Sequence, residues 1–189
     1  MKAQISAPSL KRLIQATRGF IDRSDRHPVH KYIRLEFSRE FSLVTAIAVD
    51  GYKISIEHAT CSVDEDFTAY IKAVIPPARK NSVAFIELND GVCSININGC
   101  IVGYQQPDDN FIDWKNALSD VDQKPVQYRI GFNGDYLLAA LQAAKASVGN
   151  TFSKPIILEF RSSLDPLLIK TNQSDVKMVL PVRLKEESE

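Results

Sequence analysis

The stretch Ser9-Leu-Lys-Arg-Leu-Ile-Gln-Ala-Thr17 carries the clearest helical pattern in the chain. Its apolar residues recur at the i, i+3, i+4, i+7 spacing of one buried stripe, which predicts a helix over residues 9–22 with Ser9 as its N-cap. The other side of this helix is basic. Its cations, with two more just past the helix end, are Lys11, Arg12, Arg18, Arg23 and Arg26. The pattern predicts a helix that packs on one apolar face and turns its cations outward.

Period-two alternation follows the helix and predicts strands. Residues 33–38 alternate around Leu35, and residues 41–49 form a second alternating run. Asp50-Gly51 is a dipeptide that favours a tight hairpin, because both turn positions need positive φ. A returning strand is predicted over residues 52–56.

The middle of the chain is predicted to be an antiparallel meander. Residues 67–75, 84–88, 93–97 and 100–104 alternate, and Pro76-Pro77 ends the first of these runs. Asn89-Asp90-Gly91 and Asn98-Gly99 supply the turns. Residues 76–82 leave little room for a helix.

The first pattern returns after a polar stretch at residues 107–125. Residues 126–132 predict a strand, and Asn133 is the expected cap of a helix that turns Leu137, Leu138, Leu141 and Ala144 to one face. Strands are predicted at 156–160, 167–170 and 176–184, and Pro181 marks the last as an edge strand or a bulge.

Strand–helix–strand–strand–strand thus occurs near 3–58 and near 126–184, with a third copy between them whose helix is eroded. An internal repeat indicates assembly from small pseudo-symmetric units. The predicted fold class is α+β, with repeated βαβββ units, antiparallel sheets and helices on one face. The predicted domains are 1–118 and 126–189, joined by a linker at 119–125.

Composition limits the classes of function. The 189 residues hold 23 basic and 23 acidic side chains, and this zero net charge argues against binding nucleic acid by bulk electrostatics alone. No stretch approaches the roughly 18 apolar residues of a membrane span, and the first residues do not form a signal peptide. Cys61, Cys93 and Cys100 lie in strand-like contexts and are predicted to be buried thiols. We expect a soluble, cytoplasmic protein.

Motifs for catalysis are absent from the sequence. It contains no Gly-x-Ser-x-Gly, no Gly-rich phosphate loop and no His-Glu-x-x-His. His27 and His30 lack carboxylates or cysteines at ligand spacing, and the acidic run Asp64-Glu-Asp66 is typical of a solvated loop. We therefore predict neither an enzyme, nor a metal site, nor a bound cofactor.

Several segments resemble the bacterial DNA polymerase III beta subunit, the sliding clamp, in the order found in that family. Ser9–Thr17 and Ala48-Val-Asp-Gly-Tyr-Lys-Ile54 resemble its second domain, and Asn110–Leu118 resembles the segment that closes that domain. Gly131-Phe-Asn-Gly-Asp-Tyr-Leu-Leu138 and Met178-Val-Leu-Pro-Val-Arg-Leu184 resemble its third domain. A full clamp subunit has three domains of two repeats each, so this chain resembles a shortened and diverged clamp.

The resemblance implies that helices line a ring around duplex DNA and contact its phosphates without reading bases. The implied DNA-binding residues are the helix cations Lys11, Arg12, Arg18, Arg23 and Arg26, with Lys145 on the last helix. Taken alone, a basic helix face is more commonly just solvated. If a ring needs twelve repeats and each chain supplies three, four chains close it, so a homo-oligomer is expected.

The resemblance also implies a groove that binds short peptides of polymerase and clamp-loader type proteins. One wall is predicted from Val49, Asp50, Gly51, Tyr52, Lys53 and Ile54, and the other from Met178, Val179, Leu180, Pro181, Val182, Arg183 and Leu184. Tyr52-Lys53 replaces the family's His-Arg, and the tail 185–189 could shield the groove. The alternatives are that these residues form ordinary core, and that the protein is a clamp-derived regulator that binds such peptides or a host clamp without encircling DNA.

Overall fold

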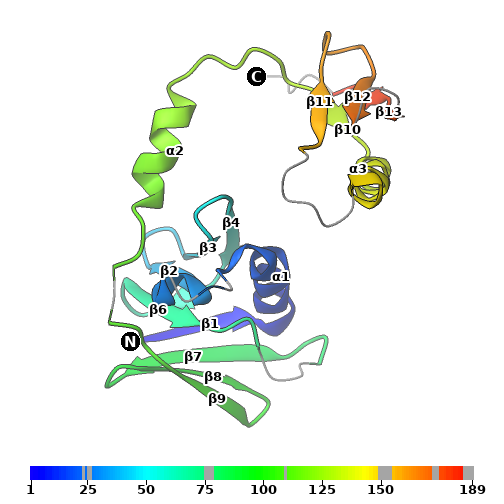
Figure 1. The fold of residues 1–189 in the computed structure, drawn as a ribbon. Helices are drawn as coiled ribbons and strands as arrows, with labels where there is room; N and C mark the ends of the chain where they lie inside the picture. The colour runs from blue at the N-terminus through cyan, green and yellow to red at the C-terminus, as the bar shows by residue number, and fades with distance from the viewer. Residues whose placement is uncertain are drawn as a thin grey trace. The chain divides into compact units, whose positions relative to one another are not determined.

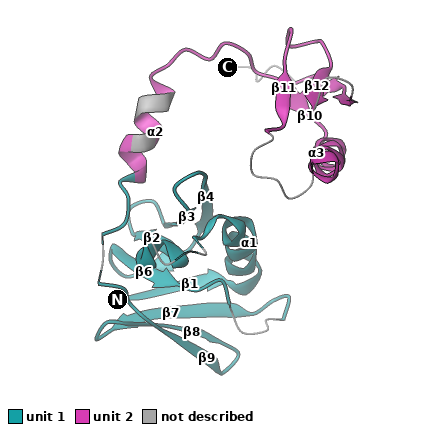
Figure 2. Ribbon diagram, viewed as in Figure 1, with its two compact units in different colours: residues 1–113 teal, residues 114–189 magenta. Residues whose placement is uncertain are grey.

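The computed structural model describes residues 1–22, 24, 27–74, 79–108, 110–148, 155–171 and 175–184, with the side chains of 117, 120 and 121 left aside. Its course is shown in Figure 1. The chain divides into two compact units, residues 1–113 and residues 114–189 (Figure 2). Arg23, Arg26 and the tail 185–189, which the sequence singled out, lie outside the described residues.

Unit 1 begins with β1 (Lys2–Ser6) and α1 (Ala7–Thr17), which continues into a 3-10 turn, η1 (Arg18–Phe20). The predicted helix is confirmed, but the prediction of Ser9 as its cap is wrong. The Ser6 hydroxyl accepts a hydrogen bond from the Ser9 N–H at 3.1 Å, one turn earlier. Pro8 fits this first turn because an N–H there would have no intrahelical partner.

Two antiparallel sheets complete unit 1, in the orders β4-β3-β2-β6 and β5-β1-β7-β8-β9. A short 3-10 turn, η2 (Pro28–Lys31), precedes the first of them. The strands are β2 (Ile33–Ser38), β3 (Leu43–Val49), β4 (Ile54–Thr60), β5 (Ser62–Val63), β6 (Phe67–Ile71), β7 (Val83–Asn89), β8 (Val92–Ile97) and β9 (Cys100–Gln105).

The two repeats of unit 1 exchange their first strands. β1 of the first repeat pairs with β7 of the second, and β6 of the second repeat pairs with β2 of the first. One hydrophobic core therefore draws on α1 and on both sheets, and its fully buried members include Leu13, Leu35, Ile71 and Ile95. Burying each such side chain contributes about 1.5–3 kcal/mol. The exchange ties both repeats into one folding unit.

The turns of unit 1 follow the sequence in two places and depart from it in a third. Asp90 and Gly91 (φ 48° and 74°) and Asn98 and Gly99 (φ 53° and 83°) form the predicted two-residue turns, which confirms the meander for β7, β8 and β9. The predicted strand 67–75 does not belong to this meander, because β6 ends at Ile71 and pairs with β2 in the other sheet. The hairpin at Asp50-Gly51 is wider than predicted. Val49 pairs with Ile54, so residues 50–53 form a four-residue loop and 52 and 53 lie outside the strand.

Unit 2 holds α2 (Trp114–Asp122), β10 (Gly131–Phe132), α3 (Gly134–Val148), β11 (Ile157–Glu159), β12 (Leu167–Lys170), β13 (Val176–Val179) and β14 (Pro181–Val182). Asn133 caps α3 as predicted, since its side-chain Oδ1 accepts from the N–H groups of Asp135 and Tyr136 at 3.0 and 3.2 Å. α2 was not predicted, and it covers part of the expected linker 119–125. The division into domains 1–118 and 126–189, predicted from the sequence, stays a prediction.

Four further predictions, three for unit 2 and one for the cysteines, need correction. The predicted strand 126–132 enters a ladder only at Gly131 and Phe132. The predicted strand 176–184 breaks at Leu180, because its second part, β14, turns away from β13 to pair with β10. Leu138 is exposed rather than part of the buried face of α3, and Cys100 is exposed at the start of the edge strand β9, whereas Cys61 and Cys93 are buried.

The core of unit 2 is small. Its buried residues are Ala144, Leu167, Ile169 and Val179, where α3 crosses the sheet β11-β12-β13. In the described part of the chain, no helix is long and apolar enough to cross a membrane.

Candidate functional site

The exposed side of α1 carries two of the predicted cations in line. Lys11 and Arg18 are seven residues apart, so they lie on the same face of the helix, and both are exposed. Arg12 points elsewhere. Its guanidinium lies 2.8 Å from the Glu57 carboxylate and also donates to the carbonyl oxygen of His58, both on β4. The structure therefore separates Arg12, which ties α1 to the edge strand, from Lys11 and Arg18.

Lys145, the remaining predicted cation, is exposed in the last turn of α3. An ammonium group there complements the partial negative charge at a helix C-terminus. Lys145 belongs to unit 2, whereas Lys11, Arg12 and Arg18 belong to unit 1.

The loop of residues 50–53 is stabilised by hydrogen bonds within the loop and by a contact with the end of the first helix. One oxygen of the Asp50 carboxylate accepts from the N–H groups of Tyr52 and Lys53, each at 3.1 Å. Burial alone would raise the pKa of Asp50, but these two bonds and the Lys53 ammonium favour the ionised form and bring the pKa below its ordinary value. Gly51 at φ 88° allows the chain to turn there.

Lys53 anchors this loop to the end of α1. Its ammonium donates to the carbonyl oxygen of Gly19 at 2.6 Å and lies 5.3 Å from the centre of the Phe20 ring. The anchored loop leaves Tyr52 92% exposed at its tip. Of the predicted first groove wall, Tyr52 thus presents its ring to the surface, whereas Val49 is buried and serves the core.

The second predicted groove wall is an apolar surface on β13, β14 and the residues beside them. Met178, Leu180, Val182 and Leu184 are exposed, whereas Val179 is buried. Leu184 covers the backbone of β10, because a Cβ built on Gly131 would lie 2.6 Å from a Leu184 methyl carbon. Pro181 is partly buried, and Arg183 is exposed. The two walls belong to different units, each of which is described by itself.

Sequence reasoning missed the residues that position these groups. Glu57 and the carbonyl groups of His58 and Gly19 lie far along the chain from Arg12 or Lys53, so helical or strand periodicity could not pair them. The only available signal was the charge of Glu57 on an alternating strand.

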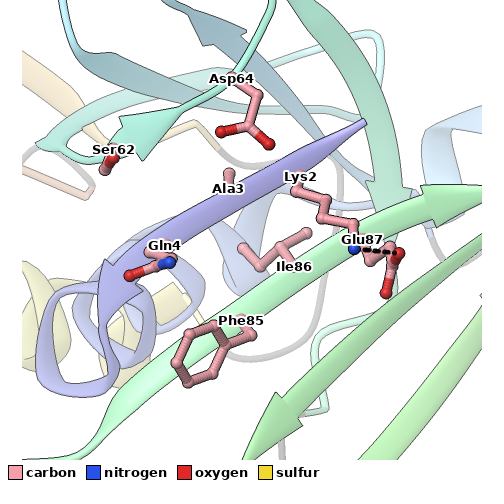
Figure 3. A pocket seen from close by; sticks show the side chains of 8 residues that line it. All are labelled: Lys2, Ala3, Gln4, Ser62, Asp64, Phe85, Ile86 and Glu87. Carbon is pink, nitrogen blue, oxygen red and sulfur yellow. Dashed lines mark ion pairs between the residues drawn. The ribbon is translucent and has the colours of Figure 1, made fainter.

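A shallow hollow of about 190 Å³ lies on the outer side of the second sheet, over β1, β5 and β7 (Figure 3). Its charged lining residues are Lys2, Asp64 and Glu87, of which Lys2 and Glu87 pair with each other at 3.2 Å. We assign no function to this hollow. Within the described ranges, no three His, Cys, Asp or Glu side chains are grouped so that they could hold a metal ion.

The fold class is α+β with antiparallel sheets, as the sequence predicted. Within that class, the chain has the fold of the DNA sliding clamp, and the comparisons that establish this are structural. The resemblance to the DNA polymerase III beta subunit is thereby confirmed at the level of the fold. Compared with protein-family models and with curated protein sequences, the chain matches none.

Three solved structures carry this comparison. A protein described as a DNA polymerase III beta subunit from Eubacterium rectale matches 96% of this chain, with a TM-score of 0.80 and 15% identity. The DNA polymerase sliding clamp of Bacillus subtilis matches 98%, with a TM-score of 0.67 and 15% identity, and the Helicobacter pylori beta clamp bound to a DNA ligase peptide matches 96%, with a TM-score of 0.70 and 12% identity. The chain spans 50%, 65% and 49% of the lengths of these three proteins, in that order.

Proposed function

We propose that this protein is a cytoplasmic, non-catalytic accessory protein of the sliding-clamp type. It binds duplex DNA without reading its sequence and docks partner proteins through short peptides. The observation that carries the proposal is the clamp fold over 96% of the chain. The exposed cations of α1 and the exposed apolar residues of β13 and β14 supply the chemistry.

Contact with DNA is assigned to Lys11 and Arg18. At 1.5 Å of rise per residue they stand about 10 Å apart along α1, so each can reach a different phosphate. Contacts to phosphates need only flexible cations and no base readout. The zero net charge means that the rest of the surface adds little attraction, so a few local contacts would dominate the affinity.

The test measures binding of a fluorescent duplex by anisotropy over a range of salt concentrations. In the double variant Lys11→Glu/Arg18→Glu we expect weaker binding and a salt slope smaller by about 1.8, because each lost phosphate contact removes about 0.9. The control Arg39→Glu/Lys80→Glu makes the same change of charge at exposed positions outside α1 and should bind like the unaltered protein. An equal slope in all three proteins would refute the assignment to α1.

Peptide docking is assigned to the apolar surface of β13, Leu180 and β14. The H. pylori clamp was solved with a DNA ligase peptide, which makes that peptide a suitable probe. We expect Leu180→Asp to weaken binding at least tenfold, because one buried apolar side chain contributes about 1.5–3 kcal/mol. Val176→Asp, at an exposed position of β13 outside the predicted groove, is the matched control. Equal binding by the two variants would contradict the groove.

The second candidate function is a clamp-derived regulator that binds such peptides, or a host clamp, without encircling DNA. The ion pair of Arg12 with Glu57 favours it, because this pair leaves α1 with fewer cations for DNA than the sequence suggested. Peptide binding without any DNA binding would establish the regulator in place of the clamp.

A further inference from the structure

Unit 1 shows how a βαβββ repeat is completed. Its strand β2 turns Leu35 and Phe37 toward the core, where they are 0% and 3% exposed. β6, the first strand of the other repeat, pairs along the outer edge of β2, and its Phe67 and Ala69 belong to the same core. Phe67 of β6 lies directly opposite Phe37, and the two rings stack with centres 4.3 Å apart.

The described residues of unit 2 contain the same arrangement for a single repeat. Leu158 of β11 pairs with Ile169 as Leu35 pairs with Ala46, and Phe160 follows β11 at the position that corresponds to Phe37. Yet Leu158 and Phe160 are 45% and 47% exposed. Among the residues that the structure describes, no strand pairs with the outer edge of β11.

An apolar cavity of about 520 Å³ lies beside this edge of β11. It lies between residues 127–132, α3 and the sheet strands β11 and β12, and its lining includes Tyr128, Leu141, Leu158 and Phe160. The repeat has four buried core residues, and the lining of the cavity is largely apolar. An exposed apolar surface of this kind is typical of an interaction site.

The segment before α3 lacks a partner as well. Val126, Tyr128 and Ile130 alternate as in a strand, but the ladder includes only Gly131 and Phe132, and Val126 and Tyr128 are 72% and 62% exposed. The counterpart of this segment in unit 1 is β1. On one side β1 pairs with β5, as β10 pairs with β14. On its other side β1 pairs with β7 over all five of its residues. Among its described residues, unit 2 thus holds both a strand-like segment outside any ladder and a sheet edge without a partner strand.

We propose that two copies of this chain pair through unit 2. Residues 126–132 of each copy add to the outer edge of β11 of the other copy, so that two half-domains close into one two-repeat domain built like unit 1. In this register Tyr128 of one copy lies opposite Phe160 of the other, as Phe67 lies opposite Phe37, and Ile130 lies opposite Leu158. The pairing is independent of DNA and peptide binding.

A second copy is the occupant that the surface fits, because strand and edge occur on the same unit and a two-fold axis satisfies both at once. The exposed parts of Val126, Tyr128, Leu158 and Phe160 amount to roughly 400 Å² per copy, taking about 200 Å² for each aromatic side chain. Two copies then bury about 800 Å² of apolar surface, close to the apolar share of a standard interface of about 1,600 Å².

The first experiment measures the particle mass of the full chain by light scattering after size exclusion. The unaltered protein is expected to contain at least two copies, and Tyr128→Asp to halve the particle mass. Tyr136→Asp makes the same change at a position of α3 that is 69% exposed and outside the cavity, and should leave the mass unchanged. Circular dichroism melting of both variants verifies that they are folded. A monomeric unaltered protein, or equal masses for the two folded variants, would overturn the proposal.

A cross-link tests the register. Opposed residues of an antiparallel pair have Cα atoms about 4.5–5.5 Å apart, which a disulfide can span. In a Cys100→Ser background, mixing Tyr128→Cys with Phe160→Cys should give a cross-linked dimer under oxidation, whereas mixing Tyr136→Cys with Phe160→Cys should not. Equal yields from the two mixtures would contradict the pairing.

Discussion

Replacing Arg12 with alanine tests whether this cation serves the fold or the DNA. The structure holds α1 on the edge strand β4 through the Arg12 guanidinium, which reaches the Glu57 carboxylate at 2.8 Å and the His58 carbonyl oxygen. The contact of Ser55 with the Ala16 carbonyl oxygen, at 3.5 Å, is long and neutral by comparison. Arg12 therefore provides the strongest polar link between the middle of the helix and the sheet.

The expected loss of stability follows from these contacts. An exposed ion pair contributes about 0.2–1 kcal/mol. The second bond is charge-assisted, but the arginine side chain is half exposed, so it contributes less than a buried charged hydrogen bond of about 1.5–3 kcal/mol. We expect Arg12→Ala to lower the free energy of unfolding by about 1–2 kcal/mol, and Arg12 and Glu57 to show a coupling of about 0.5 kcal/mol in a double-mutant cycle.

The assay is urea unfolding followed by circular dichroism, with Arg12→Ala, Glu57→Gln, the double variant and Lys11→Ala. Lys11 is exposed on the same helix, so its replacement should change stability by no more than about 0.5 kcal/mol. DNA binding should respond in the opposite order, with a greater loss for Lys11→Ala. If Arg12→Ala is as stable as Lys11→Ala and loses more DNA affinity, the reasoning about Arg12 is wrong.

Two further predictions concern single groups in unit 1. The pKa of Asp50 is lower in the folded protein than its ordinary value of about 3.9, so its hydrogen bonds stabilise the fold above that pH and are lost as the pH falls through the folded-state pKa. The stability difference between the unaltered protein and Asp50→Ala, measured by urea unfolding, should therefore shrink on acidification; a constant difference would contradict the loop structure. Of the three thiols, only exposed Cys100 should react quickly with a thiol reagent, since burial raises the pKa of Cys93 to about 12 and also raises that of Cys61, whereas all three should react once the protein is unfolded.

The sequence predicted unit 1 well because its signals there are local. Asp90-Gly91 and Asn98-Gly99 determine two turns by themselves, since their positive φ angles suit few other residues. The alternation around Leu35 identifies a strand with one buried face. What the sequence could not supply was the pairing of distant groups. The bond of Lys53 to Gly19 joins residues 34 positions apart, and it anchors the four-residue hairpin loop to the end of the helix.

In unit 2 the predictions failed where the segment depends on a neighbour. An alternating pattern indicates which face of a segment can be buried, whereas a ladder of backbone hydrogen bonds needs a second strand beside that segment. β6 supplies that strand to β2 within one chain, but the described residues of unit 2 supply none to β11. Under the pairing proposed above, residues 126–130 and the exposed Leu158 have a single physical cause, because each would be covered by the other in a second copy. The alternation at 126–132 indicates which face of the segment can be buried, but among the described residues only Gly131 and Phe132 enter a ladder.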